Sequence, residues 1–281
     1  MDLRNLDDAT FAEIEAAFDE YGVIVFRDQF LTPAEQVAFS RRFGPLDHFP
    51  YGLFNMADHP EIVILSNILQ EGKPIGMNDA GRYWHSDMWT LDQPPRGSML
   101  CAIEVPVEDK IALGDTYFAS STHAFDTLPH ELKARVASLH GVFSTARYKK
   151  FVGHEKPDNV YLKEIVKAAA EQPDSEVTHP LVRKHPRTGK TCLFIVEGVI
   201  RTILELENAE ANDLLDTLLA HTVRPEVTYR HRWRVGDVVM WDNYSAMHRA
   251  IGDFELPLRR LMHRTTLSAS EMESSHDATT G

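Results

Sequence analysis

Apolar and polar positions follow two different periods at the start of the chain. Apolar side chains recur at helical spacing over residues 7–21, and Gly22 is placed to end that helix. The unbroken apolar run 23–26 then predicts a buried strand. Residues 32–35 (Thr-Pro-Ala-Glu) combine an N-cap threonine, a proline at the first helical position and a capping-box glutamate, so a second helix should run to about Phe43. The chain is therefore expected to begin as helix, strand, helix.

Short apolar runs bounded by polar turns predict further strands. They cover residues 62–65, 97–103, 193–196 and 238–241. Helical spacing separates these runs over residues 122–139, 160–170 and 207–221. Turn chemistry at residues 185–190 (His-Pro-Arg-Thr-Gly-Lys) predicts a hairpin. Strands separated by long helical excursions are typical of an α+β chain.

The composition is that of a globular protein. Of the 281 residues, 43% are hydrophobic and 25% are charged, so the chain can bury a sizeable core without disulfides. We expect one domain over residues 1–281, with a disordered tail from about residue 270. The net charge of -13 and the scattered basic residues argue against nucleic-acid binding, which needs clustered Lys and Arg. An anionic ligand would have to be bound by a few local arginines.

The two cysteines and the N-terminus indicate a protein of the reducing cytoplasm. Cys101 and Cys192 are far apart and form no C-x-x-C pattern, so neither a disulfide framework nor a zinc-thiolate site is predicted. The N-terminal residues lack a basic segment followed by an apolar run, and no stretch has the length of a membrane span. We therefore expect a cytoplasmic protein without a membrane partner.

One short motif, His85-Ser86-Asp87, carries candidate metal chemistry. In an extended segment an imidazole and a carboxylate two residues apart point to the same face and can bind one metal ion. A second histidine would complete a 2-His-1-carboxylate triad, which suits non-haem iron(II). His248 is the best placed of the 14 histidines, because it follows the predicted strand 238–241 and precedes an arginine cluster. A lone H-x-D is usually a surface turn, so the hypothesis depends on the whole set.

A series of motifs runs through the chain between about residues 10 and 268. They are Phe26-Arg27-Asp28-Gln29, Phe43-Gly44, Trp84-His85-Ser86-Asp87, Gly114-Asp115-Thr116, His179-Pro180-Leu181-Val182, Trp241-Asp242-Asn243, His248 and Arg260-Leu261-Met262-His263-Arg264. In this order they resemble the signatures of the TauD/TfdA family, which includes taurine dioxygenase and aryloxyalkanoate dioxygenases. An ordered set is far more specific than any one of its members.

The resemblance implies a fold, a cofactor set and a reaction. The fold is a double-stranded β-helix, a jelly-roll core with flanking helices. His85, Asp87 and His248 would bind Fe(II), and Arg260 and Thr116 would hold the distal carboxylate of 2-oxoglutarate. The co-substrates 2-oxoglutarate and O2 would give succinate, carbon dioxide and a hydroxylated product.

The resemblance also bears on the substrate. Arg264 matches the family position that often binds a substrate anion, although an isolated arginine is more often a surface cation. Phe49 stands where taurine dioxygenase has a substrate histidine, which favours a more apolar substrate. Asp87 favours hydroxylation, because relatives that halogenate lack this carboxylate. We therefore expect a small organic anion, such as an aryloxy or alkyl carboxylate, a sulfonate or a sulfate, with C–O or C–S cleavage where the hydroxylated product collapses.

Other readings stay open at this stage. A secondary-metabolite hydroxylase acting on an amino-acid derivative is one, and a non-catalytic metal-binding β-helix protein is another. A zinc hydrolase with the same ligands is a third, but the chain has no H-E-x-x-H pairing and Arg260 would have no function in it. The sequence also leaves open whether the chain forms a homodimer or a homotetramer.

Overall fold

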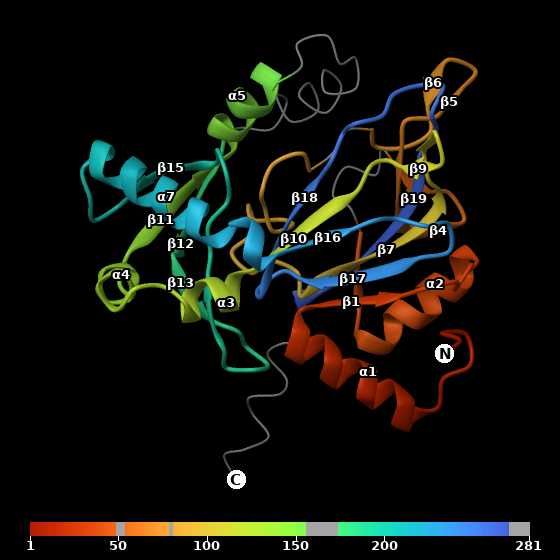
Figure 1. The fold of residues 1–281 in the computed structure, drawn as a ribbon, viewed down its shortest axis with the longest axis horizontal. Helices are drawn as coiled ribbons and strands as arrows, with labels where there is room; N and C mark the ends of the chain where they lie inside the picture. The colour runs from red at the N-terminus through yellow and green to blue at the C-terminus, as the bar shows by residue number, and fades with distance from the viewer. Residues whose placement is uncertain (49–53, 79–80, 156–173, 270–281) are drawn as a thin grey trace.

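A seven-stranded antiparallel sheet forms the centre of the computed structural model, which describes residues 1–48, 54–78, 81–155 and 174–269. Its strand order is β1-β17-β7-β19-β4-β3, and β2 pairs with β19. The strands are β1 (Val23–Phe26), β2 (Leu46–Asp47), β3 (Asn55–Met56), β4 (His59–Ser66), β7 (Gly97–Glu104), β17 (Val238–Asp242) and β19 (Leu261–Leu267). Strands from both ends of the chain thus lie side by side, as red β1 and blue β17 do in Figure 1.

A second sheet of three strands packs against the first. It consists of β10 (Thr116–Ser120) between β16 (Thr228–His231) and β18 (Ala246–Ala250). Phe118 of β10 pairs with His248 on one side and Tyr229 on the other, so the three side chains share one face. The Phe118 ring lies 5.8 Å from that of Trp241 in the large sheet. The two sheets therefore enclose a common interior, and the predicted jelly-roll core is confirmed.

Two N-terminal helices cover the outer face of the large sheet. Helix α1 (Asp8–Tyr21) is capped by the Asp7 side chain, and Gly22 ends it with φ of 68°. Helix α2 (Pro33–Ser40) has the predicted capping box of Thr32 and Glu35 and continues into a short 3-10 helix, η1 (Arg41–Phe43). Their apolar side chains pack on the large sheet in one cluster, which includes Phe18, Phe39, Phe43, Met99 and Met240.

A long excursion between β10 and β16 builds a second apolar cluster beside the sandwich (Figure 1). Its helical elements are α3 (Ser121–Asp126), α4 (His130–Val136), α5 (Thr145–Glu155), α7 (Asn208–Thr222) and η2 (Pro225–Val227). Its strands are β11 (His140–Ser144), β12 (Glu176–Pro180), β13 (Val182–Lys184), β14 (Thr191–Leu193) and β15 (Ile200–Ile203). Strands β13 and β14 form the predicted hairpin. Two small hairpins elsewhere are β5 (Leu69–Gln70) with β6 (Lys73–Pro74), and β8 (Val107–Glu108) with β9 (Ile111–Ala112).

Two predicted elements are wrong. The helix expected over 122–139 is broken into α3 and α4, because Pro129 cannot continue a helix and instead occupies the N-cap position of α4. The strand expected over 193–196 ends at Leu193, although residues 194–196 are buried. A continuous apolar run reports burial, which an irregular segment can satisfy as well as a strand.

Some expectations fall where the structure gives no description. The helix predicted over 160–170, Phe49 and the disordered tail predicted from about residue 270 lie outside the described residues. In the part of the chain that is described, no helix combines the length and the apolar character needed to cross a membrane.

Candidate functional site

The structure brings His85, Asp87 and His248 together in the interior. His85 and His248 form a two-way backbone bridge, with N–O distances of 3.0 and 2.8 Å, and their rings are 4.1 Å apart. Asp87 Oδ1 lies 3.8 Å from His85 Nε2 and 3.9 Å from His248 Nε2. All three residues are buried, and the three donor atoms lie within 4.8 Å of one another. They are the one group of this kind in the described part of the chain.

Hydrogen bonds set the orientation of the first two ligands. His85 Nδ1 donates to the carbonyl of Tyr83 at 2.8 Å, which leaves the Nε2 lone pair toward Asp87. The carboxylate of Asp87 accepts from Ser98 Oγ at 2.6 Å through Oδ2, so Oδ1 faces the histidines. The backbone N–H of Asp87 donates to Asn243 Oδ1 at 3.2 Å. Such outer contacts fix the direction of ligand lone pairs.

Burial and charge keep the three ligands in the forms that bind a metal. Burial lowers the pKa of His85, and it lowers the pKa of His248 to about 3. Burial alone would raise the pKa of Asp87, but the Arg264 guanidinium and the two imidazoles hold it well below its ordinary value. Near neutral pH the site therefore offers two neutral imidazoles and one carboxylate.

Arg260 precedes β19 and is a partly buried cation with no counter-charge among the described residues. It lines a pocket with Leu65, Met77, Arg82, Ala250 and Phe254. Its buried Nε–H donates to no partner, and within the described residues no carboxylate pairs with it. Burial lowers the pKa of Arg260 to about 10, so the group is still charged at neutral pH. A buried charge of this kind is costly unless an anion pairs with it.

Thr116 begins β10 and lies on the strand next to the same pocket. Its cross-strand partner is Ala250, which lines the pocket of Arg260. The Thr116 hydroxyl oxygen accepts from Trp233 Nε1 at 3.0 Å, which leaves the hydroxyl hydrogen available to donate. The pocket therefore offers a guanidinium, and a hydroxyl donor lies beside it, a combination suited to a carboxylate.

Arg264 lies closer to the metal ligands than Arg260 does. Its Nη1 is 3.3 Å from Asp87 Oδ1, and its side chain is largely buried. A β-bulge at Leu261 and Met262 separates the two arginines. Arg260 therefore lines the pocket beside Ala250, whereas Arg264 reaches the metal ligands.

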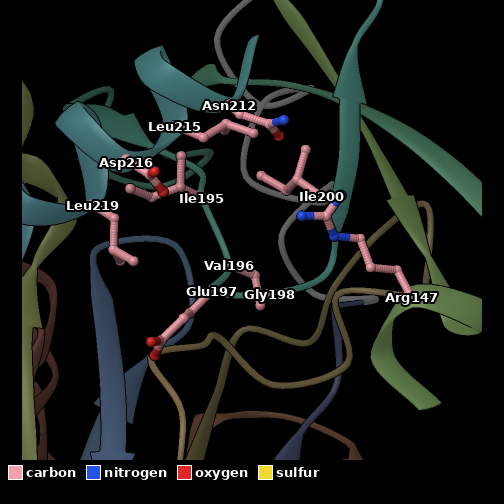
Figure 2. A pocket seen from close by; sticks show the side chains of 10 residues that line it. All are labelled: Arg147, Ile195, Val196, Glu197, Gly198, Ile200, Asn212, Leu215, Asp216 and Leu219. Atoms are coloured by element: carbon pink, nitrogen blue, oxygen red, sulfur yellow. The ribbon is translucent and has the colours of Figure 1, made fainter. Parts of the chain in front are cut away.

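A second pocket adjoins the site from the excursion. Figure 2 shows it between α7 and the segment before β15, with Arg147, Glu197, Asn212 and Asp216 among the residues that line it. Glu197 Oε2 accepts from the backbone N–H of Trp84, the residue before His85, at 2.8 Å. The excursion thus supports the segment that carries the first ligand.

Several supporting residues escape sequence reasoning. Ser98 lies in an apolar run, and its polar side chain in that run is the one sequence feature that could have indicated a function for it. For Asn243 the sequence fits a turn before His248 as well as it fits a hydrogen bond that supports the metal ligands. The bond between Trp233 and Thr116 joins positions 117 residues apart, and no local pattern indicates it.

A jelly-roll sandwich with two histidines and a carboxylate in its interior defines the class of non-haem metal-dependent oxygenases. The chain matches the family described as "Taurine catabolism dioxygenase TauD, TfdA family" over residues 1–266. The chain therefore belongs to the TauD/TfdA family of 2-oxoglutarate-dependent dioxygenases, as its motifs predict.

Known relatives cover nearly the whole chain. The alpha-ketoglutarate-dependent 2,4-dichlorophenoxyacetate dioxygenase of Cupriavidus pinatubonensis is 34% identical over 95% of this chain and 91% of its own length. Pentalenolactone F synthase of Streptomyces arenae is 33% identical over 92% of this chain and 87% of its own length. The crystal structure of AAD-2 in complex with Mn(II) and N-oxalylglycine superposes with a TM-score of 0.77 at 29% identity, over 95% of this chain and 92% of that one. The protein is an enzyme of this family, which uses 2-oxoglutarate, O2 and a metal.

Proposed function

We propose that the protein hydroxylates a small organic anion, with Fe(II) bound by His85, Asp87 and His248. The observation that carries this proposal is the charged, partly buried Arg260, which has no counter-ion among the described residues, in a pocket beside a buried 2-His-1-carboxylate set. A non-catalytic protein would have no need of that cation. The donor set itself favours Fe(II), because two imidazoles and one carboxylate leave coordination positions for other ligands.

The protein's own residues would bind and orient the reactants. Arg260 holds the distal carboxylate of 2-oxoglutarate bidentately, and Thr116 adds one hydrogen bond. When bound, Fe(II) supplies the oxygen chemistry that couples decarboxylation of 2-oxoglutarate to hydroxylation. Ser98 and Asn243 keep the Asp87 carboxylate and backbone in place during this reaction. The buried interior excludes bulk water from the reacting groups.

Arg264 is the proposed partner of the substrate anion. Its guanidinium lies 3.3 Å from Asp87 Oδ1, and it does not line the pocket of Arg260. An aryloxy or alkyl carboxylate, a sulfonate or a sulfate would suit this group. Where the new hydroxyl lies beside oxygen or sulfur, the product collapses and the C–O or C–S bond breaks. The 2,4-dichlorophenoxyacetate dioxygenase, an enzyme named for an aryloxy carboxylate, is the relative that supports this class.

Replacement of Arg264 is expected to separate substrate from co-substrate recognition. Arg264→Ala should retain 2-oxoglutarate binding and slow uncoupled succinate formation, but lose the stimulation that the substrate gives to the wild type. Arg264→Lys should recover only part of it, because a point charge cannot reproduce the guanidinium fork. Arg249→Ala, on the exposed side of β18, is the control. Succinate release and 2-oxoglutarate titration measure the two effects. If Arg264→Ala weakens 2-oxoglutarate as much as Arg260→Ala does, Arg264 belongs to the co-substrate site.

A substrate screen tests the proposal as a whole. Purified protein with Fe(II) and 2-oxoglutarate should release succinate faster in the presence of an aryloxy carboxylate, alkyl sulfonate or alkyl sulfate. Matched neutral amides and alcohols are the controls, since they lack the anion that Arg264 would bind. Faster succinate release with the neutral compounds alone would overturn the anionic-substrate assignment.

A second candidate is hydroxylation of a secondary metabolite. The likeness to pentalenolactone F synthase at 33% identity favours this alternative. The same succinate screen separates the two, if lactones and amino-acid derivatives are included. We also propose that the chain acts as a single cytoplasmic domain that assembles as a dimer or tetramer, which sedimentation of the purified protein would test.

A further inference from the structure

The hairpin of β13 and β14 carries polar residues that are neither metal ligands nor part of the pocket of Arg260. Two of its residues, Arg183 and His185, contact the turn 242–245. This turn joins β17 to β18, the strand that carries His248. The hairpin therefore reaches the metal site from the excursion.

Arg183 is a partly buried residue whose guanidinium lies between two aromatic rings. Its Cζ lies 3.6 Å from the centroid of Phe194 and 4.1 Å from that of Tyr244. Its Nη2 donates to the backbone carbonyl of Asn243 at 2.9 Å. Within the described residues no carboxylate forms an ion pair with Arg183, and burial lowers its pKa to about 10. Such a cation is costly to bury, so packing alone is a poor explanation for it.

Asn243 connects this guanidinium to the ligand segment. It is fully buried, and its Oδ1 accepts from the backbone N–H of Asp87 at 3.2 Å. Its Nδ2 donates to the carbonyl of Pro95 at 3.3 Å, which fixes the orientation of the amide. A shift of the Asn243 backbone would therefore move the acceptor that holds Asp87.

His185 closes the other side of the turn. Its Nδ1 accepts from the backbone N–H groups of Arg187 and Thr188, so its hydrogen is on Nε2 and is donated to Asp242 Oδ2 at 3.0 Å. Asp242 Oδ1 accepts from the backbone N–H of Ser245 at 2.8 Å. The turn is thus held by its own side chains as well as by the hairpin, and Arg183 is the contact that bears on Asn243.

We propose that Arg183 is a positioning residue for the metal centre, which acts through Asn243 to hold Asp87 in its ligating place. Arg183 contacts neither the metal ligands nor the pocket of Arg260. This inference rests on the proposed metal site, and it assigns a function to the β13–β14 hairpin that the ligand set does not require.

The test measures Mn(II) affinity of the full chain by electron paramagnetic resonance, without turnover. Arg183→Met keeps an apolar stem between the rings but removes the donor and the charge, and it should weaken Mn(II) binding about 10-fold, as loss of an outer-shell partner does. Arg183→Lys should recover part of the loss. Lys184→Met is the control, because Lys184 lies on the same hairpin and its exposed ammonium donates to Thr191 Oγ1 at 2.8 Å.

Thermal unfolding and a double-mutant cycle separate positioning from general destabilisation. Phe194→Leu loosens the same core but keeps the bond to Asn243, so it should lower the melting temperature and spare Mn(II) affinity. Because Arg183 acts through Asn243, the Asn243→Ala variant combined with Arg183→Met should bind Mn(II) no more weakly than Asn243→Ala alone. Fully additive losses, or equal losses in Arg183→Met and Phe194→Leu, would overturn the proposal. Failure of the wild type to bind Mn(II) would instead overturn the metal site itself.

Discussion

Arg260→Ala is expected to weaken 2-oxoglutarate binding by about 30- to 1,000-fold. The substitution removes a partly desolvated cation that would pair with the distal carboxylate, whereas the Thr116 hydroxyl and Arg82, which also lines the pocket, remain. Loss of a buried charge-assisted pair costs on the order of 2–4 kcal/mol, and each 1.4 kcal/mol is tenfold in the dissociation constant. Anaerobic titration of the Mn(II)-loaded protein with 2-oxoglutarate by calorimetry gives the affinity directly.

Arg259→Ala is the matched control for this experiment. Arg259 precedes Arg260 in the chain, but its side chain is 54% exposed and pairs with Glu104 at 3.2 Å. An exposed pair of this kind contributes little, so Arg259→Ala should keep the wild-type affinity. Equal affinities of Arg260→Ala and wild type for 2-oxoglutarate would remove Arg260 from the co-substrate site.

Asp87→Ala is expected to abolish measurable metal binding and activity. Asp87 is the one carboxylate of the predicted set, and its loss leaves two neutral imidazoles for a divalent cation. The weakening should exceed the roughly 10- to 100-fold that loss of an outer-shell partner causes. Mn(II) titration of the apoprotein by electron paramagnetic resonance measures the effect, and circular dichroism reports whether the fold is kept.

His248→Ala should behave like Asp87→Ala, whereas His123→Ala should not. His123 is an exposed histidine on α3, so its loss tests whether any imidazole on the chain contributes to the measured binding. Wild-type Mn(II) affinity in both Asp87→Ala and His248→Ala would show that the metal binds elsewhere.

The predictable part of the fold is the part encoded locally. Helix α2 follows from four consecutive residues whose caps the structure reproduces, and Gly22 ends α1 because glycine accepts φ of 68° at no steric cost. Helical spacing over 122–139 indicates helical content but not where it divides, and the structure places the break between α3 and α4 at Pro129. The buried residues 194–196 show that apolar content alone does not distinguish a strand from a buried connection.

In the candidate site, too, the residues indicated by local sequence spacing could be predicted, and those that depend on long-range contacts could not. His85 and Asp87 are two residues apart, and their spacing alone suggests a shared ligand. His248 was indicated only by its position after a predicted strand and before an arginine cluster, and by the family resemblance, because its bridge to His85 joins distant parts of the chain. The burial of Arg260 and its lack of a counter-ion could not be read from the sequence, since burial depends on how strands from both ends pair. The functions of Asn243 and Ser98 become apparent only from their hydrogen bonds with Asp87.

The order of strands in the large sheet has a consequence for biosynthesis. The strand synthesised last, β19, lies between β7 and β4, and β1 has β17 as its partner in that sheet. The sheet cannot close until β17 and β19 have been synthesised. Contacts of such high contact order form slowly, on a scale of roughly milliseconds to seconds. During that interval the apolar β1, β4 and β7 segments lack their partners, and unpaired strand edges of this kind are prone to aggregate.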